Sequence, residues 1–282
     1  MAEAVEPALV GQAGGVRMRR TMAVALVAAL VLVSCGSDDE PAADDGSTTT
    51  AAARSTTPGS APSGDDAISA ALATDHTYVV ARAAVDEIPV FADPEDTSEV
   101  QMTLPRFDPD YTGTDGEQVE QVFLAEDYED QWLHVLLPVR PNGTTGWIRL
   151  GDVEMSKHRY DITVDVGDHE LTLREAGEVV QRSPIAVGTQ DTPTPGGRFY
   201  LNALIQPPDP DTVYGTYAYA LSGYSDTLTQ FAGGDGVIGI HGTNDPSVLG
   251  SDVSHGCIRM RNEDIESLVE MLPLGTPVEI VA

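Results

Sequence analysis

The chain has 282 residues, with 15 Lys and Arg against 45 Asp and Glu, which gives a formal net charge of −30. That charge excludes nucleic acid as a partner, and it excludes electrostatic binding to anionic lipid, because both need a cationic surface. A hydrophobic fraction of 41% is enough to build a core, and the length predicts one or two domains.

The first 34 residues are predicted to be a secretory signal peptide. Arginines at positions 17, 19 and 20 precede an apolar run over residues 22–33. This run is shorter than the roughly 20 residues that span a bilayer, and it has the length of a signal-peptide core. Met18 begins a more typical signal than Met1 does, so we predict that residues 1–17 come from a misassigned start codon.

The signal ends in a motif that resembles the bacterial lipobox, in which an aliphatic residue and small residues precede a Cys. The motif here is LVSC at residues 32–35. The resemblance implies that Cys35 receives a thioether-linked lipid and becomes the mature N-terminus. An ordinary secretory signal with an unrelated Cys is the alternative.

The segment that follows Cys35 is predicted to be a disordered acidic tether, so that residues 35–76 form a lipidated Cys and its linker. Residues 36–76 are rich in Asp, Ser, Thr, Ala, Gly and Pro and nearly lack large apolar side chains. Such a segment buries too little surface to offset the entropy of ordering. We therefore expect a protein anchored by lipid on the outer face of the cell membrane, within the cell-wall zone.

Residues 77–155 are predicted to form a small β domain. Five runs have strand-like composition and are separated by turn residues; they lie at residues 77–82, 88–91, 121–125, 132–137 and 145–150. The pieces DQWLHV at 130–135 and GWI at 146–148 resemble bacterial SH3-like wall-associated domains. We therefore expect an SH3-like barrel.

Residues 156–282 alternate apolar and polar residues over several strand lengths. The predicted strands are 160–166, 170–175, 179–182, 184–188, 198–201, 237–240 and 276–281. One helix is predicted over 262–272, with Asn262 as its first residue and acidic side chains in its first turn. The long segment 206–236 is predicted to be irregular, and its tyrosines at 214, 217, 219 and 224 could line a cleft.

Cys257 is the strongest candidate for chemistry. If Cys35 is lipidated or removed, Cys257 is the one thiol of the mature chain, and a lone thiol outside the cytoplasm is a liability. His255 and Arg259 stand two residues to either side of it and favour the thiolate. Gly256 permits a close backbone approach for an oxyanion, and His241 follows a strand. The pattern indicates a Cys/His acyl-transfer site.

Two alternatives remain open for the same residues. Cys257 could be an inert buried thiol. A zinc ion could instead be bound by His241, His255 and Cys257, with Asp245 or Asp252 as a further ligand.

Residues 156–282 resemble the L,D-transpeptidase catalytic domain of the YkuD type. The resemblance rests on TPTPG at 192–196, HGTNDP at 241–246 and SHGCIRM at 254–260, with twelve residues between His241 and Ser254. It implies a β-rich, sandwich-like fold with the Cys on a loop above the sheet. The expected fold is thus mainly β: a small SH3-like barrel, then a sandwich-like catalytic domain with one C-terminal helix.

The resemblance also implies a role for each site residue. Cys257 would be the nucleophile and His241 the general base and acid, oriented by the Gly242 carbonyl. His255 would shape the pocket and support it electrostatically. The backbone N–H groups of Gly256 and Cys257 would form the oxyanion hole.

A second group of residues is expected to bind substrate. Arg259 could hold a carboxylate through a bidentate contact, although many family members have Asn at that position. We add Ser254, Thr243 and Tyr217 to this group as substrate-binding residues.

The implied reaction is peptidoglycan cross-linking without a metal or cofactor. Cys257 would attack the third residue of a donor tetrapeptide, release D-Ala and pass the acyl group to the diamino acid of a neighbouring stem, forming a 3→3 link. Water as acceptor would make the enzyme a carboxypeptidase. The implied partners are stem peptides and, through the lipid, the membrane; nucleic acid is not expected to bind. We expect the protein to be a monomer and its thiol to be acylated by carbapenems. A papain-like wall peptidase is a rival, but there the Cys normally precedes the His.

Overall fold

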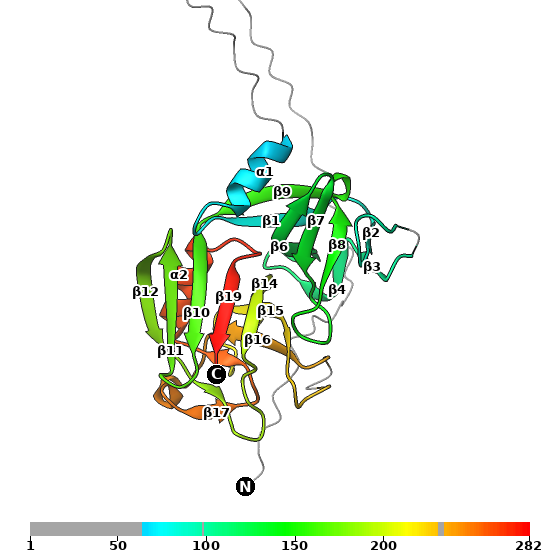
Figure 1. The fold of residues 1–282 in the computed structure, drawn as a ribbon. Coiled ribbons are helices and arrows are strands. Elements are labelled where there is room, and N and C mark those ends of the chain that lie inside the picture. Colours follow the sequence, from blue (N-terminus) through cyan, green and yellow to red (C-terminus); the bar gives the residue numbers. More distant parts are fainter. Residues whose placement is uncertain (1–63, 98, 231–233) are drawn as a thin grey trace, which may run out of the picture. The chain divides into compact units, whose positions relative to one another are not determined.

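The computed structural model describes residues 64–282, apart from residue 98 and residues 231–233 (Figure 1). The predicted signal peptide, the lipidation of Cys35 and most of the predicted tether lie outside the described residues. Within the described part of the chain, no helix is long and apolar enough to cross a membrane.

The first described element is a helix that the sequence analysis did not predict, α1 (Gly64–Leu72). Its buried residues Ile68 and Ala71 pack against the core of the following strands. The prediction of a disordered tether as far as residue 76 is therefore wrong for these residues. The physical reason is that two small apolar contacts are enough to order a short helix when a preformed core receives them.

The strands that follow form a five-stranded antiparallel sheet in the order β8-β7-β6-β1-β9, together with two separate two-stranded ribbons. Their bounds are β1 (Tyr78–Ala83), β2 (Glu87–Val90), β3 (Met102–Pro105), β4 (Phe107–Thr112), β5 (Gln118–Glu120), β6 (Val122–Glu129), β7 (Trp132–Leu136), β8 (Thr145–Arg149) and β9 (Val153–His158). A short 3-10 helix, η1 (Leu150–Asp152), precedes β9.

Alternation along these strands builds the core of this amino-terminal region, which we define as residues 64–158. In β7, Leu133 and Val135 are buried while Trp132 and His134 are only half-buried, as the two-residue period of a strand requires. The five predicted strands correspond to β1, β2, β6, β7 and β8, whereas β3, β4, β5 and β9 were not predicted. The SH3-like barrel stays a prediction.

The predicted domain boundary after residue 155 cuts through β9. Residues as far as His158 pair with β1, so β9 belongs to the amino-terminal sheet. We define residues 159–282 as the carboxy-terminal region.

The carboxy-terminal region is organised by an eight-stranded mixed sheet in the order β12-β11-β10-β19-β14-β15-β16-β18. Its strands are β10 (Tyr160–Asp165), β11 (Glu170–Glu175), β12 (Glu178–Pro184), β14 (Gly197–Ile205), β15 (Ala218–Tyr224), β16 (Val237–His241), β18 (Ile258–Arg259) and β19 (Pro277–Val281). The remaining elements are β13 (Val187–Gly188), paired with β17 (Asp252–Ser254), the 3-10 helix η2 (Pro246–Val248) and α2 (Asn262–Met271).

β15 corrects the prediction that 206–236 is irregular throughout. Its sequence, AYALSGY, places Tyr219 and Leu221 on one side and small residues on the other, and six of its seven residues are buried. A strand buried on both faces lacks the polar alternation by which it could be recognised.

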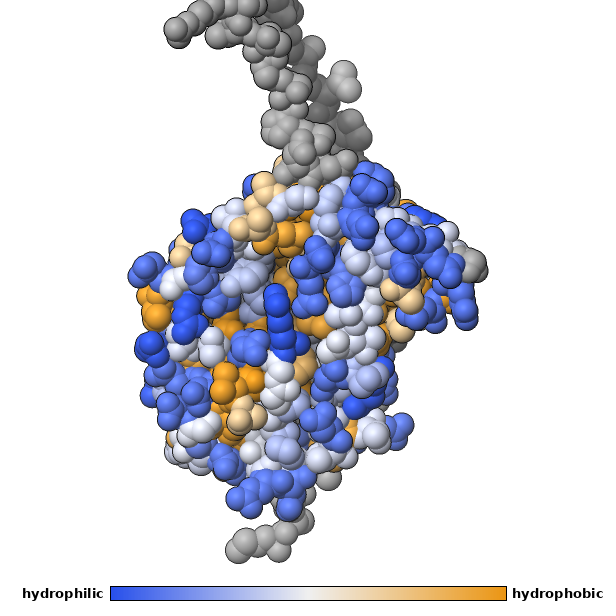
Figure 2. All heavy atoms as spheres, in the orientation of Figure 1, coloured by the Kyte–Doolittle hydropathy of each residue, from blue (hydrophilic) through white to orange (hydrophobic). Residues whose placement is uncertain are grey.

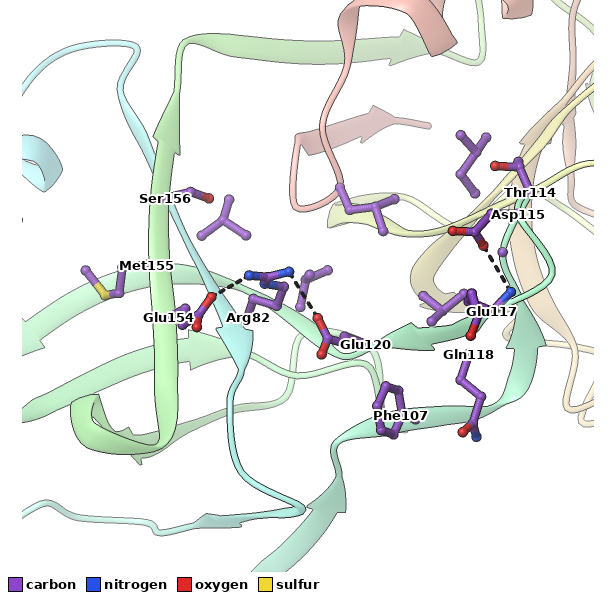
Figure 3. A pocket seen from close by; sticks show the side chains of 16 residues that line it. Arg82, Phe107, Thr114, Asp115, Glu117, Gln118, Glu120, Glu154, Met155 and Ser156 are labelled. Carbon is purple, nitrogen blue, oxygen red and sulfur yellow. Dashed lines mark hydrogen bonds and ion pairs between the residues drawn. The ribbon is translucent and has the colours of Figure 1, made fainter. Parts of the chain in front are cut away.

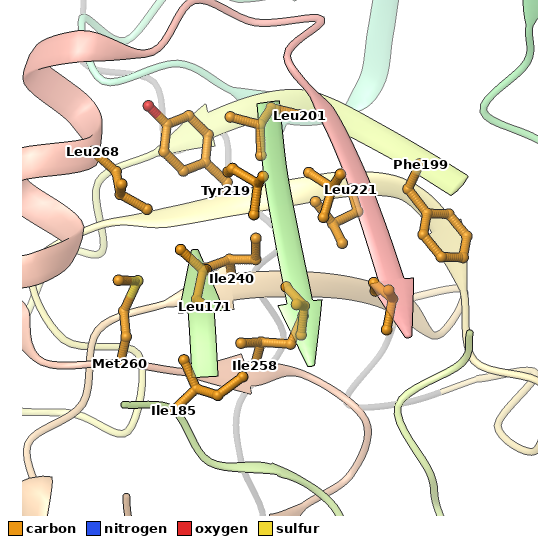
Figure 4. Close-up of a cluster of buried hydrophobic side chains, with 14 of the residues drawn as sticks. Leu171, Ile185, Phe199, Leu201, Tyr219, Leu221, Ile240, Ile258, Met260 and Leu268 are labelled. Carbon is orange, nitrogen blue, oxygen red and sulfur yellow. The ribbon is translucent and has the colours of Figure 1, made fainter. Parts of the chain in front are cut away.

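One hydrophobic core lies inside this sheet. Side chains from β11, near one end of the strand order, and from β16 and β18, at the other end, belong to the same cluster. The sheet must therefore curl, and α2 packs against the same cluster through Ile265 and Leu268. Figure 4 shows labelled members of this core, among them Leu171, Tyr219 and Ile240, which come from different strands.

The amino-terminal region packs against the other face of β14. Tyr200 is fully buried in a cluster with Val80, Val122, Leu124 and Leu136 of the amino-terminal strands. This burial removes aromatic and aliphatic surface from water, which favours the contact. On the surface drawn in Figure 2, hydrophobic residues appear as separate patches among hydrophilic ones.

Polar contacts tie the same two regions together around the β7–β8 loop. The Arg140 guanidinium donates to the carbonyls of Ser225, Leu228 and Asp235 at 2.8, 3.1 and 2.9 Å. Its carbon also lies 4.7 Å from the ring centroid of Tyr224. A single cation of the amino-terminal region therefore fixes both ends of the β15–β16 connection.

Candidate active site

His241 is the last residue of β16 and is almost fully buried, with 1% of its surface exposed. Its Nδ1 lies 2.7 Å from the carbonyl oxygen of Gly242. Because a carbonyl only accepts, Nδ1 must carry the proton, and the neutral ring then has its lone pair on Nε2. This is the arrangement of a general base held in one tautomer.

Parallel pairing brings the His241 strand beside the Cys257 segment. Ile240 pairs with Ile258 and His241 with Arg259. Ile240 and Ile258 both belong to the core, so His241 and Arg259 share the opposite face of the sheet. Cys257 precedes Ile258 by one residue, so alternation places its side chain on the His241 face as well.

The segment before Cys257 is held by a hydrogen-bonded turn. The Gly256 N–H donates to Ser254 Oγ at 3.1 Å, and the Ser254 hydroxyl donates to the Cys257 carbonyl at 2.6 Å. Gly256 has φ +119°, and a Cβ there would approach Ile238 Cδ1 to 2.9 Å. Only glycine fits this position without strain.

Thr194 of the TPTPG segment stabilises this turn through hydrogen bonds. Its hydroxyl donates to the Gly256 carbonyl at 2.9 Å and accepts from the Gly188 N–H at 2.9 Å. Thr194 is buried, so removal of the hydroxyl would leave both buried backbone groups without this partner. The Thr192 hydroxyl makes a further bond to the Ser254 carbonyl at 3.3 Å.

Asn262 joins three segments near His241. Its Oδ1 accepts from the N–H of Thr216 at 3.3 Å and of Thr243 at 3.1 Å. A Cβ at Gly215 or at Gly242 would collide with this oxygen. The predicted start of the helix at Asn262 is confirmed, with Arg261 as the N-cap residue. The role of the Asn262 side chain in joining these segments was not predicted.

Burial controls the protonation of His241. Its pKa is lowered from 6.5 to about 4, chiefly because burial disfavours the charged ring and in part because Arg259 is positively charged. Hydrogen bonds to the backbone of Gly242 and Val213 act in the opposite direction. His241 is therefore neutral at pH 7 and able to accept a proton.

The other predicted residues occupy varied environments. His255 is exposed and Cys257 is half-buried. Ser254 and Thr243 are buried, and their hydroxyls bond within their own loops, Thr243 Oγ1 accepting from the Asp245 N–H. Their substrate-binding roles, and the oxyanion role of Gly256, stay predictions.

Among the tyrosines, Tyr214 lies against the catalytic histidine candidate. Its ring centroid is 5.0 Å from that of His241. Tyr217, which was predicted to bind substrate, packs partly against the main core and accepts from the Gly242 N–H through its carbonyl. Tyr219 is a core residue, and the Tyr224 hydroxyl donates to the Pro138 carbonyl.

The zinc alternative finds no geometric support. Among the described residues, no group of three or more His, Cys, Asp and Glu side chains could hold a metal ion. The proposed additional ligands have other partners: Asp252 lies 2.7 Å from His169 Nε2, and Asp245 caps η2 through the Ser247 N–H.

A separate cavity of about 730 Å³ lies beside the β4–β5 ribbon (Figure 3). Arg82 projects into it between Glu120 and Glu154 and forms ion pairs with both. None of the predicted site residues lines this cavity.

Comparison with known proteins agrees with this geometry. Residues 159–280 match the YkuD family, the L,D-transpeptidase catalytic domain. YqjB of Bacillus subtilis, assigned to the L,D-transpeptidases, is 33% identical over 130 residues, which cover 42% of this chain and 69% of YqjB. The chain belongs to the L,D-transpeptidase family.

Other L,D-transpeptidases match over the same region. YkuD of Bacillus subtilis is 39% identical over 121 residues, or 43% of this chain and 65% of YkuD. The chain thus spans less than two thirds of that relative's length. The structure of an L,D-transpeptidase from Mycobacterium smegmatis covers 58% of this chain and 92% of its own, at 16% identity and a TM-score of 0.35.

The depressed pKa of His241 predicts that this L,D-transpeptidase loses stability in acid. Unfolding lets the ring take up a proton near pH 6.5, whereas the folded ring stays neutral down to about pH 4. Stability is therefore fully present above pH 6.5 and falls as the pH drops toward 4, by roughly 3 kcal/mol for this one buried imidazole.

Urea unfolding between pH 7.5 and 4.5 measures this loss. His241→Gln should reduce the pH dependence, leaving the part that comes from His158, whose pKa burial also lowers to about 4. His134→Gln, at a half-buried residue of β7, serves as the control. An unchanged dependence in His241→Gln would contradict the assignment.

Thr194→Val tests the support of the cysteine turn. The substitution keeps the side-chain volume but leaves the Gly188 N–H and the Gly256 carbonyl unpaired. We expect a loss of about 2 kcal/mol in unfolding free energy and slower alkylation of Cys257 by iodoacetamide. Thr163→Val, on β10, is the control; equal behaviour of the two variants would refute the role of Thr194.

Proposed function

We propose that this L,D-transpeptidase forms 3→3 cross-links in peptidoglycan through a thioester on Cys257. The observation that supports the proposal is the pairing of β16 with β18, because β16 ends at His241 and β18 begins directly after Cys257. The fixed Nδ1–H tautomer leaves Nε2 as the proton acceptor. A base and a thiol so arranged are suited to acyl transfer.

The first half-reaction would release D-Ala. His241 Nε2 takes the thiol proton as the Cys257 sulfur attacks the carbonyl of the third stem residue, a diamino acid such as meso-diaminopimelate. The peptide bond to the fourth residue breaks, and the departing amine receives the proton from His241. The acyl group remains on sulfur as a thioester.

The second half-reaction would form the cross-link. The side-chain amine of a neighbouring stem attacks the thioester carbon, His241 takes its proton, and the carbon–sulfur bond breaks. The thiolate regains the proton from His241. The thioester retains enough reactivity toward amines for this step to proceed without ATP.

Two neighbouring groups would assist these steps. Arg259 lies at the register position of His241 on the same face, where its guanidinium suits a substrate carboxylate. The Cys257 and Gly256 N–H groups would stabilise the oxyanion, the latter by sharing the hydrogen that it donates to Ser254 Oγ.

Mass spectrometry of the protein lacking its signal tests the mechanism. A carbapenem should add its mass to the wild type and not to Cys257→Ala, and His241→Gln should lower the rate of acyl transfer by roughly 10²–10⁴-fold. Reaction with tetrapeptide stems should yield dimers with 3→3 links. Tripeptides without dimers would show a carboxypeptidase, and an equal adduct on Cys257→Ala would refute the nucleophile.

We further propose that lipid on Cys35 anchors the enzyme to the outer face of the cell membrane, with the polar segment after it reaching toward the wall. The LVSC motif supports this proposal. Mass analysis of the mature N-terminus should find a lipid-modified Cys35. An unmodified N-terminus created by cleavage elsewhere would contradict the anchor.

A further inference from the structure

The β4–β5 ribbon of the amino-terminal region reaches the sheet that carries the active site. The ribbon pairs Phe107 with Glu120 and Thr112 with Gln118. Its residues Tyr111 and Val119 pack in one cluster with Ala203, Ala220 and Val237 of the catalytic sheet.

The face that receives the ribbon is the face of His241. Ala218 pairs with His241 and Ala220 with Gly239, whereas Tyr219 and Ile240 between them enter the core. Strand alternation therefore places Ala220 on the same side as His241. Small residues at these positions leave room above the sheet, and Tyr111 occupies part of that room.

A buried hydrogen bond fixes the ribbon to β14. Asn202 Nδ2 donates to Asp108 Oδ2 at 3.2 Å, and both residues are buried. The other carboxylate oxygen of Asp108 accepts from the Asp110 N–H at 3.0 Å. This anchor lies three residues before Tyr111 and limits the movement of its backbone.

Strand register places Tyr111 on the side of the cysteine segment. Tyr111 packs against Ala220, which pairs with Gly239, and Gly239 precedes Ile240 just as Cys257 precedes Ile258, the partner of Ile240. The pKa of the Tyr111 phenol is raised well above the ordinary value, first by burial and then by the nearby Asp108 carboxylate. The phenol stays protonated at neutral pH and can donate a hydrogen bond.

We propose that Tyr111 is a specificity-determining residue of the transpeptidase site: its ring forms a wall beside Cys257, and its hydroxyl donates to a backbone carbonyl of the donor stem peptide. The inference rests on the proposed function for the identity of that peptide. It makes the amino-terminal region a part of the substrate site.

The test compares Tyr111→Ala and Tyr111→Phe with Val119→Ala in the protein lacking its signal. Val119 belongs to the same ribbon and the same cluster, so its truncation reproduces the packing loss without removing the phenol. We expect kcat/KM for a tetrapeptide donor to fall at least tenfold in Tyr111→Ala and about threefold in Tyr111→Phe. Val119→Ala should stay within twofold of the wild type.

A second measurement does not depend on the natural substrate. Cys257 is the one thiol of the chain after Cys35, so alkylation reports on it alone. The measured quantity is the ratio of the Cys257 alkylation rate with a bulky maleimide to the rate with iodoacetamide. Tyr111→Ala should raise this ratio at least fivefold, and Tyr111→Phe and Val119→Ala should leave it unchanged. If the wild type forms no thioester with the peptide, the proposed function fails, and this ratio still decides whether Tyr111 lines the thiol site.

Equal behaviour of Tyr111→Ala and Val119→Ala in both measurements would overturn the inference, because the effect would then come from packing. Thermal unfolding of each variant shows that the compared proteins are folded.

Discussion

The parallel pairing of β16 with β18 is the contact on which the active site depends. It joins residues 240–241 to residues 258–259 and brings His241 and the Cys257 segment to one face, while Ile240 and Ile258 enter the core on the other. The core therefore holds the site in place. A slip of one residue in this register would turn His241 toward the core, so the packing of the two isoleucines protects the geometry of the chemistry.

Burial of His241 lowers the stability of the protein in acid and keeps the base neutral at pH 7. It lowers the pKa of His241 to about 4, which weakens the protein in acid but keeps the imidazole neutral and able to take a proton at pH 7. Backbone groups near His241 and Cys257 find hydrogen-bond partners in neighbouring side chains. Asn262 Oδ1 accepts from two N–H groups near His241, and Thr194 satisfies two backbone groups beneath the cysteine turn.

The amino-terminal region is more than a neighbour of the catalytic sheet. It buries Tyr200 and fixes the β15–β16 connection through Arg140. Its β4–β5 ribbon is tied to β14 through Asp108 and Asn202, which are 94 positions apart in the sequence. The ribbon packs on the face that carries His241, and on this ground we propose that the substrate meets both regions of the chain.

The sequence by itself determined the elements with a clear local period and the chemistry of the motif. The strands around residues 160–175, the β16 strand and the carboxy-terminal helix were predictable because apolar residues recur at strand or helix spacing, and His241 and Cys257 stood out by their motif neighbours. Tertiary structure alone decided that α1 is ordered, that β15 is a strand, that Asn262 binds two distant N–H groups, and that Tyr111 packs on the face of the catalytic sheet that carries His241. Each of these depends on contacts between residues remote in sequence, and a local pattern carries no information about which distant surface will supply a partner.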